Sequence, residues 1–419
     1  MNQRAAKVDQ AEWITADAAS KLLGVKRETL YAYTSRGLIR SEAATPKRGE
    51  RARVYNRADI ERVRARSQAR SGHGPVAASA LRWGEPVLET SIGAITSAGP
   101  VYRGRSAVEL AREGARFEDV CSLLWGAPFR PEGDLDVLRL GAPIAHLRAL
   151  LRANAEPFDG MLVTAGVLAA AEQHTEASLE VARARAAAHL RRLVAACGLV
   201  NGADAVTASL EADSTARALL LALGGRTTAA SIAAVTEALV LAADHELNAS
   251  TFAARVTASA GASLPACTMS ALAALSGPLH GAATARVEAF VAEVARPERA
   301  ATAIGERLAR GESVPGFGHP LYANGDPRGA RLLLVAQRTG AKTRGVRILA
   351  SVVASMDLVA RERPTIDVGL VALASALGLS RGSALAIFAC GRVAGWIAHA
   401  LEQRAAGFLL RPRARYVGK

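Results

Sequence analysis

The stretch GFGHPLYANGDPR, residues 316–328, places a histidine on a glycine-rich loop and an arginine just inside a new helix. The glycines allow backbone conformations that other residues avoid, so His319 can project from a tight loop. Asp326 is a helix cap and Pro327 a first-turn residue, which puts Arg328 in the first helical turn. Helix N-termini attract anions, and an arginine adds to that attraction, so the stretch predicts a site for a carboxylate or a phosphate.

The composition is that of a globular protein. The chain has 419 residues, 50% of them hydrophobic, which is enough for one large core or for two to three domains. Four widely separated cysteines argue against a disulfide framework or a zinc site and predict buried, reduced thiols. The N-terminus has no apolar signal segment, and charged residues or glycines interrupt each alanine-rich run, so we expect a cytoplasmic protein without membrane spans.

Helical periodicity dominates the sequence after residue 82. Apolar residues recur at intervals of three and four in 117–126, 177–198, 228–244 and 383–403, among other segments. Val87 to Tyr102 is the one expected strand region of this body. The pattern predicts an all-α body.

The first 75 residues carry much of the positive charge. They hold 16 basic and 8 acidic side chains, a net charge of +8, and the whole chain has a formal charge of +14. Thr15 or Asp17 can cap a first helix that ends at Gly24, and Lys26 to Ser35 predicts a second helix after a short turn. A basic loop follows, and then a further helix. Residues 13–66 resemble the winged helix-turn-helix of MerR-type regulators and phage excisionases.

Two roles stay open for this module, to which we assign residues 1–70 with a linker at 71–82. A basic second helix and wing are the electrostatic pattern that DNA binding requires. The candidate DNA contacts are Lys26, Arg27, Arg36, Arg48, Arg51 and Arg53. The other role is protein–protein docking, for which Trp13, Leu38 and Ile39 supply apolar side chains. We slightly favour docking.

Two more histidines stand immediately before helices. ADHELNASTFAARVTAS, residues 243–259, contains His245, and GPLHGAATARVEAF, residues 277–290, contains His280. A single loop histidine is more often a hydrogen-bonding residue than a catalyst. Three such positions in this order, however, resemble the citrate synthase family. The match extends from about residue 83 to 419 and includes RPTIDVGLVALASALG and GRVAGWIAHALEQ.

The resemblance implies an all-α citrate synthase fold. Its large domain would comprise 83–280 and 378–419, and its small domain 281–377, which would close over the acyl-CoA and exclude water. It also implies a homodimer in which the terminal segment RPRARYVG supplies Arg411 to the neighbouring subunit. No permanently bound cofactor is implied, because acetyl-CoA acts as a co-substrate.

The resemblance assigns chemical roles to three residues. Asp367 corresponds to the base that removes a proton from the methyl group of acetyl-CoA. His280 corresponds to the donor that stabilises the thioester enolate, and His319 to the residue that polarises and protonates the ketone of oxaloacetate. Without the resemblance, Asp367 would be interpreted as a first-turn aspartate that stabilises its helix.

The remaining assignments concern binding. His245, Arg328, Arg392 and Arg411 correspond to the residues that hold the dicarboxylate, and arginine suits carboxylates because its fork is planar. The loop Gly316, Phe317, Gly318 is assigned to the acyl-CoA side of the site. Taken alone, Arg392 would be interpreted as a solvated helix residue.

Some positions depart from the family pattern. Pro320 and Ala323 stand where many bacterial relatives have arginine and lysine, which puts contacts to the CoA phosphates in doubt. Val368 and Gly369 replace a usual aromatic residue, which could make room for one more methyl group. We therefore expect a citrate synthase, with a 2-methylcitrate synthase using propionyl-CoA, or a DNA-binding regulator with a ligand-sensing body, as the alternatives.

Overall fold

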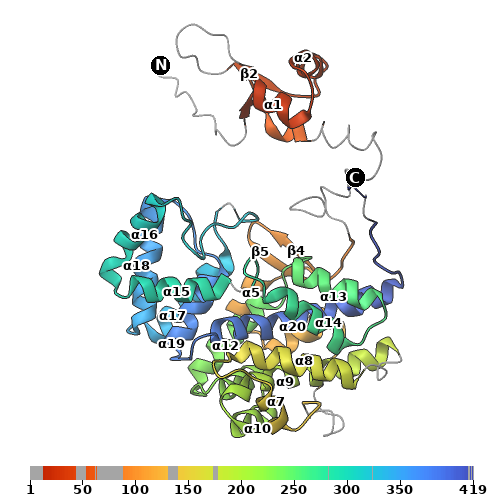
Figure 1. The fold of residues 1–419 in the computed structure, drawn as a ribbon, viewed down its shortest axis with the longest axis vertical. Helices are drawn as coiled ribbons and strands as arrows, with labels where there is room; N and C mark the ends of the chain where they lie inside the picture. Colours follow the sequence, from red (N-terminus) through yellow and green to blue (C-terminus); the bar gives the residue numbers. More distant parts are fainter. Residues whose placement is uncertain are drawn as a thin grey trace. The chain divides into compact units, whose positions relative to one another are not determined.

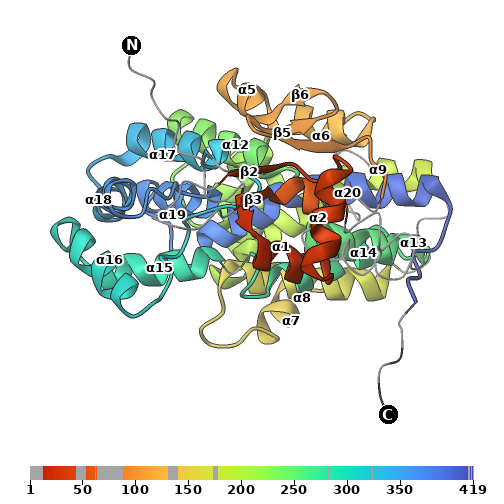
Figure 2. The same ribbon diagram turned by 90° about the horizontal axis from the view of Figure 1, so that it is seen from above.

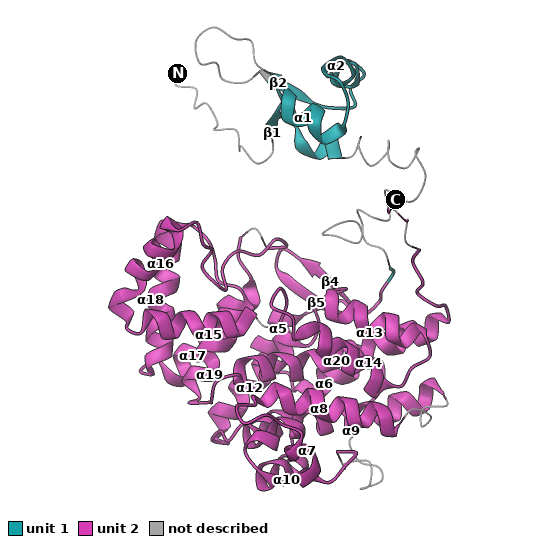
Figure 3. Ribbon diagram, viewed as in Figure 1, with its two compact units in different colours: residues 1–89 teal, residues 90–419 magenta. Residues whose placement is uncertain are grey.

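The structure is a computed structural model that describes residues 13–43, 53–61, 63, 88–130, 140–172, 178–281, 283–322, 324–413, 416 and 418. The chain forms two compact units, residues 1–89 and 90–419 (Figure 3). The first unit therefore coincides broadly with the basic module, and the second with the helical body. The proposed division of the body into a large and a small domain remains a prediction.

Unit 1 is a small helix-turn-helix domain with an antiparallel sheet. Its elements are β1 (Trp13–Thr15), α1 (Ala16–Leu23), α2 (Arg27–Ser35), β2 (Ser41–Ala43) and β3 (Arg53–Asn56), with the strands in the order β1-β3-β2. The Thr15 hydroxyl caps α1 by accepting from Ala18 N at 3.3 Å, and Gly24 ends the helix at φ 66°. Residues 57–61 and 63 are helical as well. The predicted helix-turn-helix is confirmed.

The side chains of unit 1 only partly follow the prediction. Lys26, Arg27, Arg36 and Arg53 are exposed, as DNA contacts would have to be. Ile39, expected on a docking face, is instead 1% exposed and belongs to the core of the unit, because Leu30, Tyr55 and Ile60 pack with it. The candidate DNA contacts Arg48 and Arg51 lie outside the described residues.

Unit 2 is built almost entirely of helices (Figure 1). A small antiparallel sheet opens it, with β4 (Gly93–Thr96), β5 (Gly99–Tyr102) and β6 (Arg105–Ser106), so the predicted strand region and the all-α body are confirmed. The helices before the first site loop are α5 (Ala107–Arg112), α6 (Phe117–Trp125), α7 (Ile144–Ala149), α8 (Pro157–Ala171), α9 (Leu179–Ala196), α10 (Ala203–Glu211), α11 (Thr215–Ala222) and α12 (Ala229–Ala242), with a 3-10 turn at Cys197–Val200.

The helices that carry the site follow in the second half of the chain. They are α13 (Ala249–Ser259), α14 (Leu264–Leu275), α15 (Ala283–Val294), α16 (Ala300–Ala309), α17 (Pro327–Gly340), α18 (Arg344–Val359), α19 (Ile366–Ala376) and α20 (Ser383–Ala406), with a 3-10 turn at Pro297–Arg299. In two perpendicular views, α15 to α19 lie together at one side of unit 2 (Figures 1 and 2).

Helix α20 forms the centre of the core of unit 2. It packs against α6, α8, α9, α12, α13, α14 and α19, and most of its side chains are fully buried. By length and hydropathy this 24-residue helix could cross a membrane, contrary to the expectation that every apolar run is too interrupted. Its most apolar window is 100% buried inside the fold, so protein rather than lipid surrounds it. All four cysteines are buried too, as predicted.

Helices α17 and α19 approach each other closely through two glycines. A Cβ on Gly329 would lie 2.4 Å from the carbonyl oxygen of Thr365, and a Cβ on Gly369 would lie 2.6 Å from the Cβ of Leu332. The space beside Gly369 is therefore filled by α17. Helix packing thus uses the room beside Gly369, while the expectation that the missing aromatic at 368–369 makes room for one more methyl group remains a prediction.

Candidate active site

Three loops bring the predicted histidines into one cluster. The turn between α14 and α15 carries His280, the loop between α12 and α13 carries His245, and the loop before α17 carries His319. The His245 and His319 rings are 5.6 Å apart between centroids and nearly perpendicular, and Tyr322 lies 4.8 Å from the His319 ring. Residues more than seventy positions apart thus share one site.

A short backbone pairing joins the His319 loop to the start of α19. Gly318 N donates to Arg363 O at 3.1 Å, and Thr365 N donates to Gly316 O at 2.8 Å. Phe317 forms an isolated antiparallel bridge with Pro364 between these two bonds. The pairing places His319 and Asp367 on neighbouring backbone segments.

The glycine at position 316 is required by this arrangement. Its φ is 84°, in the left-handed region, and a Cβ would lie 2.5 Å from Val368 Cγ2 and 2.7 Å from Val287 Cγ2. The loop therefore fits tightly between α15 and α19. Its predicted function, projection of the following histidine, is consistent with this geometry.

His319 is held as a neutral imidazole. Leu321 N donates to its Nδ1 at 3.1 Å, so the ring proton of the neutral form is on Nε2. Burial and the positive charge of Arg328 lower the pKa of His319, although Asp326 acts in the opposite direction. The ring can therefore donate one hydrogen bond from Nε2 at neutral pH.

Asp326 caps α17, as predicted, and also holds the arginine that follows. Its Oδ1 accepts from Arg328 N at 3.0 Å and from Arg328 Nε at 2.9 Å, and its Oδ2 accepts from Arg328 Nη2 at 2.8 Å. Oδ2 also accepts from Ile366 N at 3.1 Å, so one carboxylate serves the N-termini of both α17 and α19. Burial acts to raise the pKa of Asp326, but Arg328 outweighs it and keeps the carboxylate ionised.

Asp367 lies in the first turn of α19 but is not its cap. Thr365 occupies the capping position, and its hydroxyl donates to Asp367 Oδ2 at 2.8 Å. Burial raises the pKa of Asp367, and the Thr365 hydrogen bond and Arg328 only partly oppose it. A carboxylate with a raised pKa is a better proton acceptor than an ordinary aspartate.

His280 is linked to α13 through a serine hydroxyl. His280 Nε2 lies 2.8 Å from Ser250 Oγ, which donates to Asn248 Oδ1 at 2.8 Å and accepts from Trp396 Nε1 at 3.1 Å. Burial, reinforced by the charge of Arg392, lowers the pKa of His280 to about 4. This histidine is therefore also neutral at pH 7.

His245 differs from the cationic residue that a dicarboxylate site suggests. It is 9% exposed, and burial together with Arg328 and Arg392 holds its pKa well below the ordinary value. Its Nε2 lies 2.8 Å from the hydroxyl of Tyr322. His245 is therefore a neutral hydrogen-bonding partner, and the two arginines carry the positive charge.

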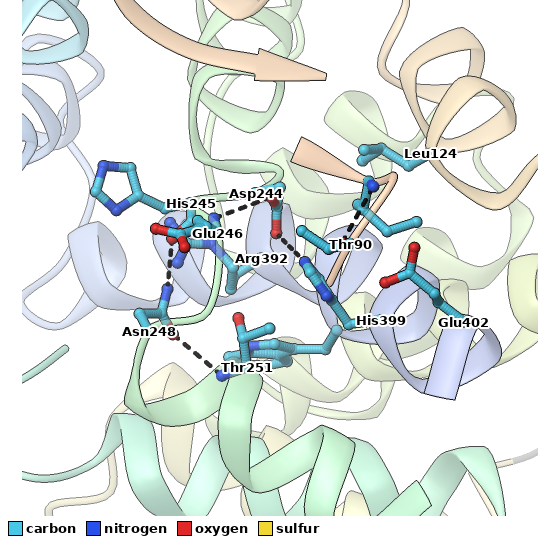
Figure 4. A network of polar contacts seen from close by, with 12 residues as sticks. Thr90, Leu124, Asp244, His245, Glu246, Asn248, Thr251, Arg392, His399 and Glu402 are labelled. Atoms are coloured by element: carbon cyan, nitrogen blue, oxygen red, sulfur yellow. Dashed lines mark hydrogen bonds and ion pairs between the residues drawn. The ribbon is translucent and has the colours of Figure 1, made fainter. Parts of the chain in front are cut away.

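Arg392 is 1% exposed, so its interpretation as a solvated helix residue is wrong. Its Nε donates to Ala242 O at 2.8 Å, and its guanidinium lies 4.7 Å from the Phe388 ring centroid. Its buried Nη2 has no hydrogen-bond partner among the described residues. Burial lowers the pKa of Arg392 to about 10, although the charge of Asp244 opposes this, so the group stays positive (Figure 4). A buried donor without a partner is suited to an anionic ligand.

Arg411 does not join this cluster within one chain. It is exposed in the segment after α20, where Leu410 N donates to Ser259 Oγ at 3.1 Å. None of the hydrogen bonds or ion pairs among the described residues connects Arg411 with the three histidines. Its predicted role depends on a second subunit.

Several site residues were not singled out from the sequence. Tyr322, Ser250 and Thr365 each contact a predicted catalytic or binding residue. Each lies within five residues of a predicted residue in the sequence. This closeness is the one sequence feature that could have identified them as site residues. Which hydroxyl reaches which ring depends on the packing of distant helices.

Comparison with known proteins agrees with the geometry. The family described as citrate synthase, C-terminal domain, matches residues 80–413, and the MerR HTH family of regulatory proteins matches 14–74. Citrate synthase 2 of Bacillus subtilis is 30% identical over 81% of this chain and 96% of its own length. A 2-methylcitrate synthase of Shewanella oneidensis is 30% identical over 80% of this chain and 92% of its own length.

Solved structures show the same fold. Citrate synthase from Thermoplasma acidophilum, determined as a ternary complex with carboxymethyl coenzyme A and oxaloacetate, matches with a TM-score of 0.68 and 25% identity, over 80% of this chain and 94% of that chain. Citrate synthase from Thermotoga maritima matches with a TM-score of 0.66 and 26% identity, over the same shares. The chain therefore belongs to the citrate synthase family of acyltransferases, and it carries a MerR-type helix-turn-helix domain at its N-terminus.

Proposed function

We propose that this protein condenses acetyl-CoA with oxaloacetate and hydrolyses the resulting citryl-CoA to citrate and CoA. The observation that carries the proposal is the clustering of neutral imidazoles with two buried arginines, beside the start of α19, whose first turn holds a carboxylate with a pKa that burial raises. Such a set can remove a proton from carbon, stabilise an oxyanion and hold a dianion at the same time.

The first step is enolisation of the thioester. Asp367 takes a proton from the methyl carbon of acetyl-CoA, and the electron pair moves onto the thioester oxygen. His280 donates a hydrogen bond to that oxygen. This role requires a proton on Nδ1 of His280. The Ser250 hydroxyl must then turn from Asn248 Oδ1 and donate to His280 Nε2, which lies 2.8 Å from Ser250 Oγ.

The second step forms the carbon–carbon bond. The enolate carbon attacks the ketone carbon of oxaloacetate while His319 Nε2–H donates to the ketone oxygen and transfers its proton to it. The proton that Asp367 took from the methyl group returns to His319 through water, so both side chains regain their starting protonation states. The hydrogen bond from Leu321 N to His319 Nδ1 keeps that proton on Nε2. Water then cleaves the thioester, which releases CoA.

Two arginines supply the charge that oxaloacetate needs. Arg392 offers its unpartnered Nη2, and Arg328, which Asp326 holds bidentately, has a fixed orientation. His245 adds a hydrogen bond rather than a charge. We further propose that Arg411 of a second subunit completes the site in a homodimer.

Binding of the CoA moiety involves the loop Gly316, Phe317, Gly318, and no permanently bound cofactor is proposed. Pro320 and Ala323 remove two positive charges that bacterial relatives place nearby. Arg363 lies beside the same loop: its carbonyl accepts from Gly318 N at 3.1 Å, and its side chain packs against Gly325. We propose this exposed arginine as a replacement contact for a CoA phosphate.

Acetyl-CoA is favoured over propionyl-CoA by the packing at α19. The glycine at position 369 contacts Leu332 and Gly329 of α17, so it adds no volume to the acyl pocket. One methylene in an apolar pocket is worth about 1–3 kcal/mol, so the preference is a matter of degree.

The test is CoA release by the purified protein with oxaloacetate and either acetyl-CoA or propionyl-CoA. We expect turnover with both and a higher kcat/KM with acetyl-CoA. A higher value with propionyl-CoA would identify a 2-methylcitrate synthase, and release with neither would refute the proposal.

A regulatory role is the second candidate, supported by the MerR-type match over residues 14–74. Lys26, Arg36 and Arg53 are exposed, but Arg27 is ion-paired with Asp17, which reduces the charge available to DNA. Binding of the full-length protein to random duplex, measured by gel shift, separates the roles. Tight binding that weakens steeply with salt would support regulation, whereas negligible binding at low salt would support a docking module in a cytoplasmic enzyme.

A further inference from the structure

Helix α20 holds the loop that precedes His245 at three consecutive residues. The contacts are Arg392 Nε to Ala242 O at 2.8 Å, Gly395 N to Ala243 O at 2.9 Å, and His399 Nε2 to Asp244 Oδ1 at 3.3 Å. Residues spaced three and four apart share one face of a helix, so one face of α20 makes all three contacts. Arg392 and the backbone leading to His245 are therefore tied to the same rigid element.

The third of these contacts joins two buried ionisable side chains, His399 and Asp244. Asp244 is 1% exposed and His399 is 0% exposed (Figure 4). Burial acts to raise the pKa of Asp244, but His399 and Arg392 outweigh it and keep the carboxylate ionised. Neither side chain is accessible to a substrate, so neither is a catalytic residue.

The Asp244 carboxylate also fixes the turn after His245. Its Oδ2 accepts from Glu246 N at 3.1 Å, and Glu246 has a φ of 54°, which non-glycine residues rarely adopt. A hydrogen bond to that amide offsets the cost of the conformation. His245 thus lies between two backbone segments that Asp244 and α20 both constrain.

Two glycines leave room for this carboxylate. A Cβ on Gly395 would lie 2.5 Å from Ala243 O and 2.6 Å from Asp244 Oδ1, and a Cβ on Gly93 would lie 2.6 Å from Asp244 Oδ2. Elements far apart in the sequence thus converge on one charged group. Because even an ionised buried pair is often no more stabilising than apolar residues of similar volume, stability alone does not account for the contact between Asp244 and His399.

We propose that Asp244 and His399 are positioning residues of the oxaloacetate site, which hold His245 at a fixed place relative to Arg392. The proposal rests on the proposed function, because it takes oxaloacetate as the ligand of both residues. Loss of the contact between His399 and Asp244 would let the loop move away from α20. A displacement of about 1 Å in such a site can lower the rate of an enzyme by up to about 100-fold. The affinity for oxaloacetate should therefore be sensitive to a shift of His245.

The test is the affinity of the full-length protein for oxaloacetate, measured by isothermal titration calorimetry. His399→Leu removes the polar contact with Asp244, whereas His399→Gln keeps an N–H donor for it. His189→Leu is the matched control, because His189 is also buried and its Nε2 lies 2.8 Å from the Thr268 hydroxyl, between other helices. We expect His399→Leu to weaken binding about tenfold or more and the other two to stay within about threefold of wild type.

The outcomes separate the two proposals. No oxaloacetate binding by the wild-type protein would overturn both. Binding by wild type and equally by folded His399→Leu would overturn only the positioning role, as would an equal loss in His189→Leu. If His399→Leu does not fold, Gly395→Ala replaces it, because the added Cβ pushes α20 away from Ala243. Wild-type affinity for oxaloacetate in Gly395→Ala would overturn the inference. The KM for acetyl-CoA should change little in any folded variant.

Discussion

Asp326→Asn is expected to destabilise the fold and the oxaloacetate site together. The Asp326 side chain is 0% exposed, and its two oxygens accept from Arg328 N, Nε and Nη2 and from Ile366 N, at 2.8 to 3.1 Å. Asparagine has nearly the same volume but replaces one oxygen by an amino group. Donors that face this group lose their acceptor, and Arg328 loses its counter-charge.

The magnitude follows from the burial of both partners. Removal of one member of a buried ion pair costs about 3–5 kcal/mol, because the other charge stays buried and unpaired. Equilibrium urea unfolding followed by circular dichroism measures this loss. Glu172→Gln is the matched control, because Glu172 pairs with buried Arg192, far along the chain from the site residues. Both variants should lose stability, but only Asp326→Asn should raise the KM for oxaloacetate.

Two results would refute this reasoning. A loss of less than about 1 kcal/mol in Asp326→Asn would show that Arg328 does not depend on this carboxylate for its charge balance. A rise in the KM for oxaloacetate that is equal in Glu172→Gln would show that general loosening of the fold, rather than the orientation of Arg328, affects binding.

Three further outcomes are expected. Asp367→Asn should lower kcat for CoA release by about 100-fold or more with the fold intact, and retention of a tenth of the activity would make the aspartate structural. Truncation after Leu410 removes Arg411 and should lower the activity strongly while the midpoint of urea unfolding changes little. Unchanged activity would refute the role of Arg411 in the site of a second subunit. The pKa of His280 is about 4 in the fold and about 6.5 in the unfolded chain, so the unfolded chain takes up the proton first and stability falls from about pH 6.5 to pH 4. His280→Gln should make urea midpoints less dependent on pH in that window, and an unchanged dependence would contradict the burial of this ring.

Local structure was predictable where a residue type dictates a backbone conformation. Asp326 and Pro327 start a helix because one accepts from the first turn and the other needs no amide hydrogen. Gly24 ends α1 in the left-handed conformation for an equally local reason. The order of the histidine segments then identified the family, and with it the residues that converge.

The contacts between distant segments were not predictable in the same way. Periodicity predicts that Gly369 lies on a helix, but it does not say which neighbours fill the space beside Gly369 or Ile39. Gly369 proved to be a helix-packing position, and Ile39 a core residue. The neutral state of His245 depends on burial and on two arginines from other elements, which a sequence without an alignment does not reveal.

The position of α20 after its packing partners in the sequence has a consequence during synthesis. This helix is the centre of the core of unit 2, yet it begins only at Ser383, so the ribosome makes it after the helices against which it packs. At about 5–20 residues per second, helix α12 waits on the order of 10–30 s, with its apolar face uncovered, for the partner against which it packs. Unit 1, whose core residues end at Val63, is complete long before. Nascent chains should therefore carry a folded unit 1 and an incomplete body, and chaperones that bind exposed apolar segments should associate with them until α20 emerges.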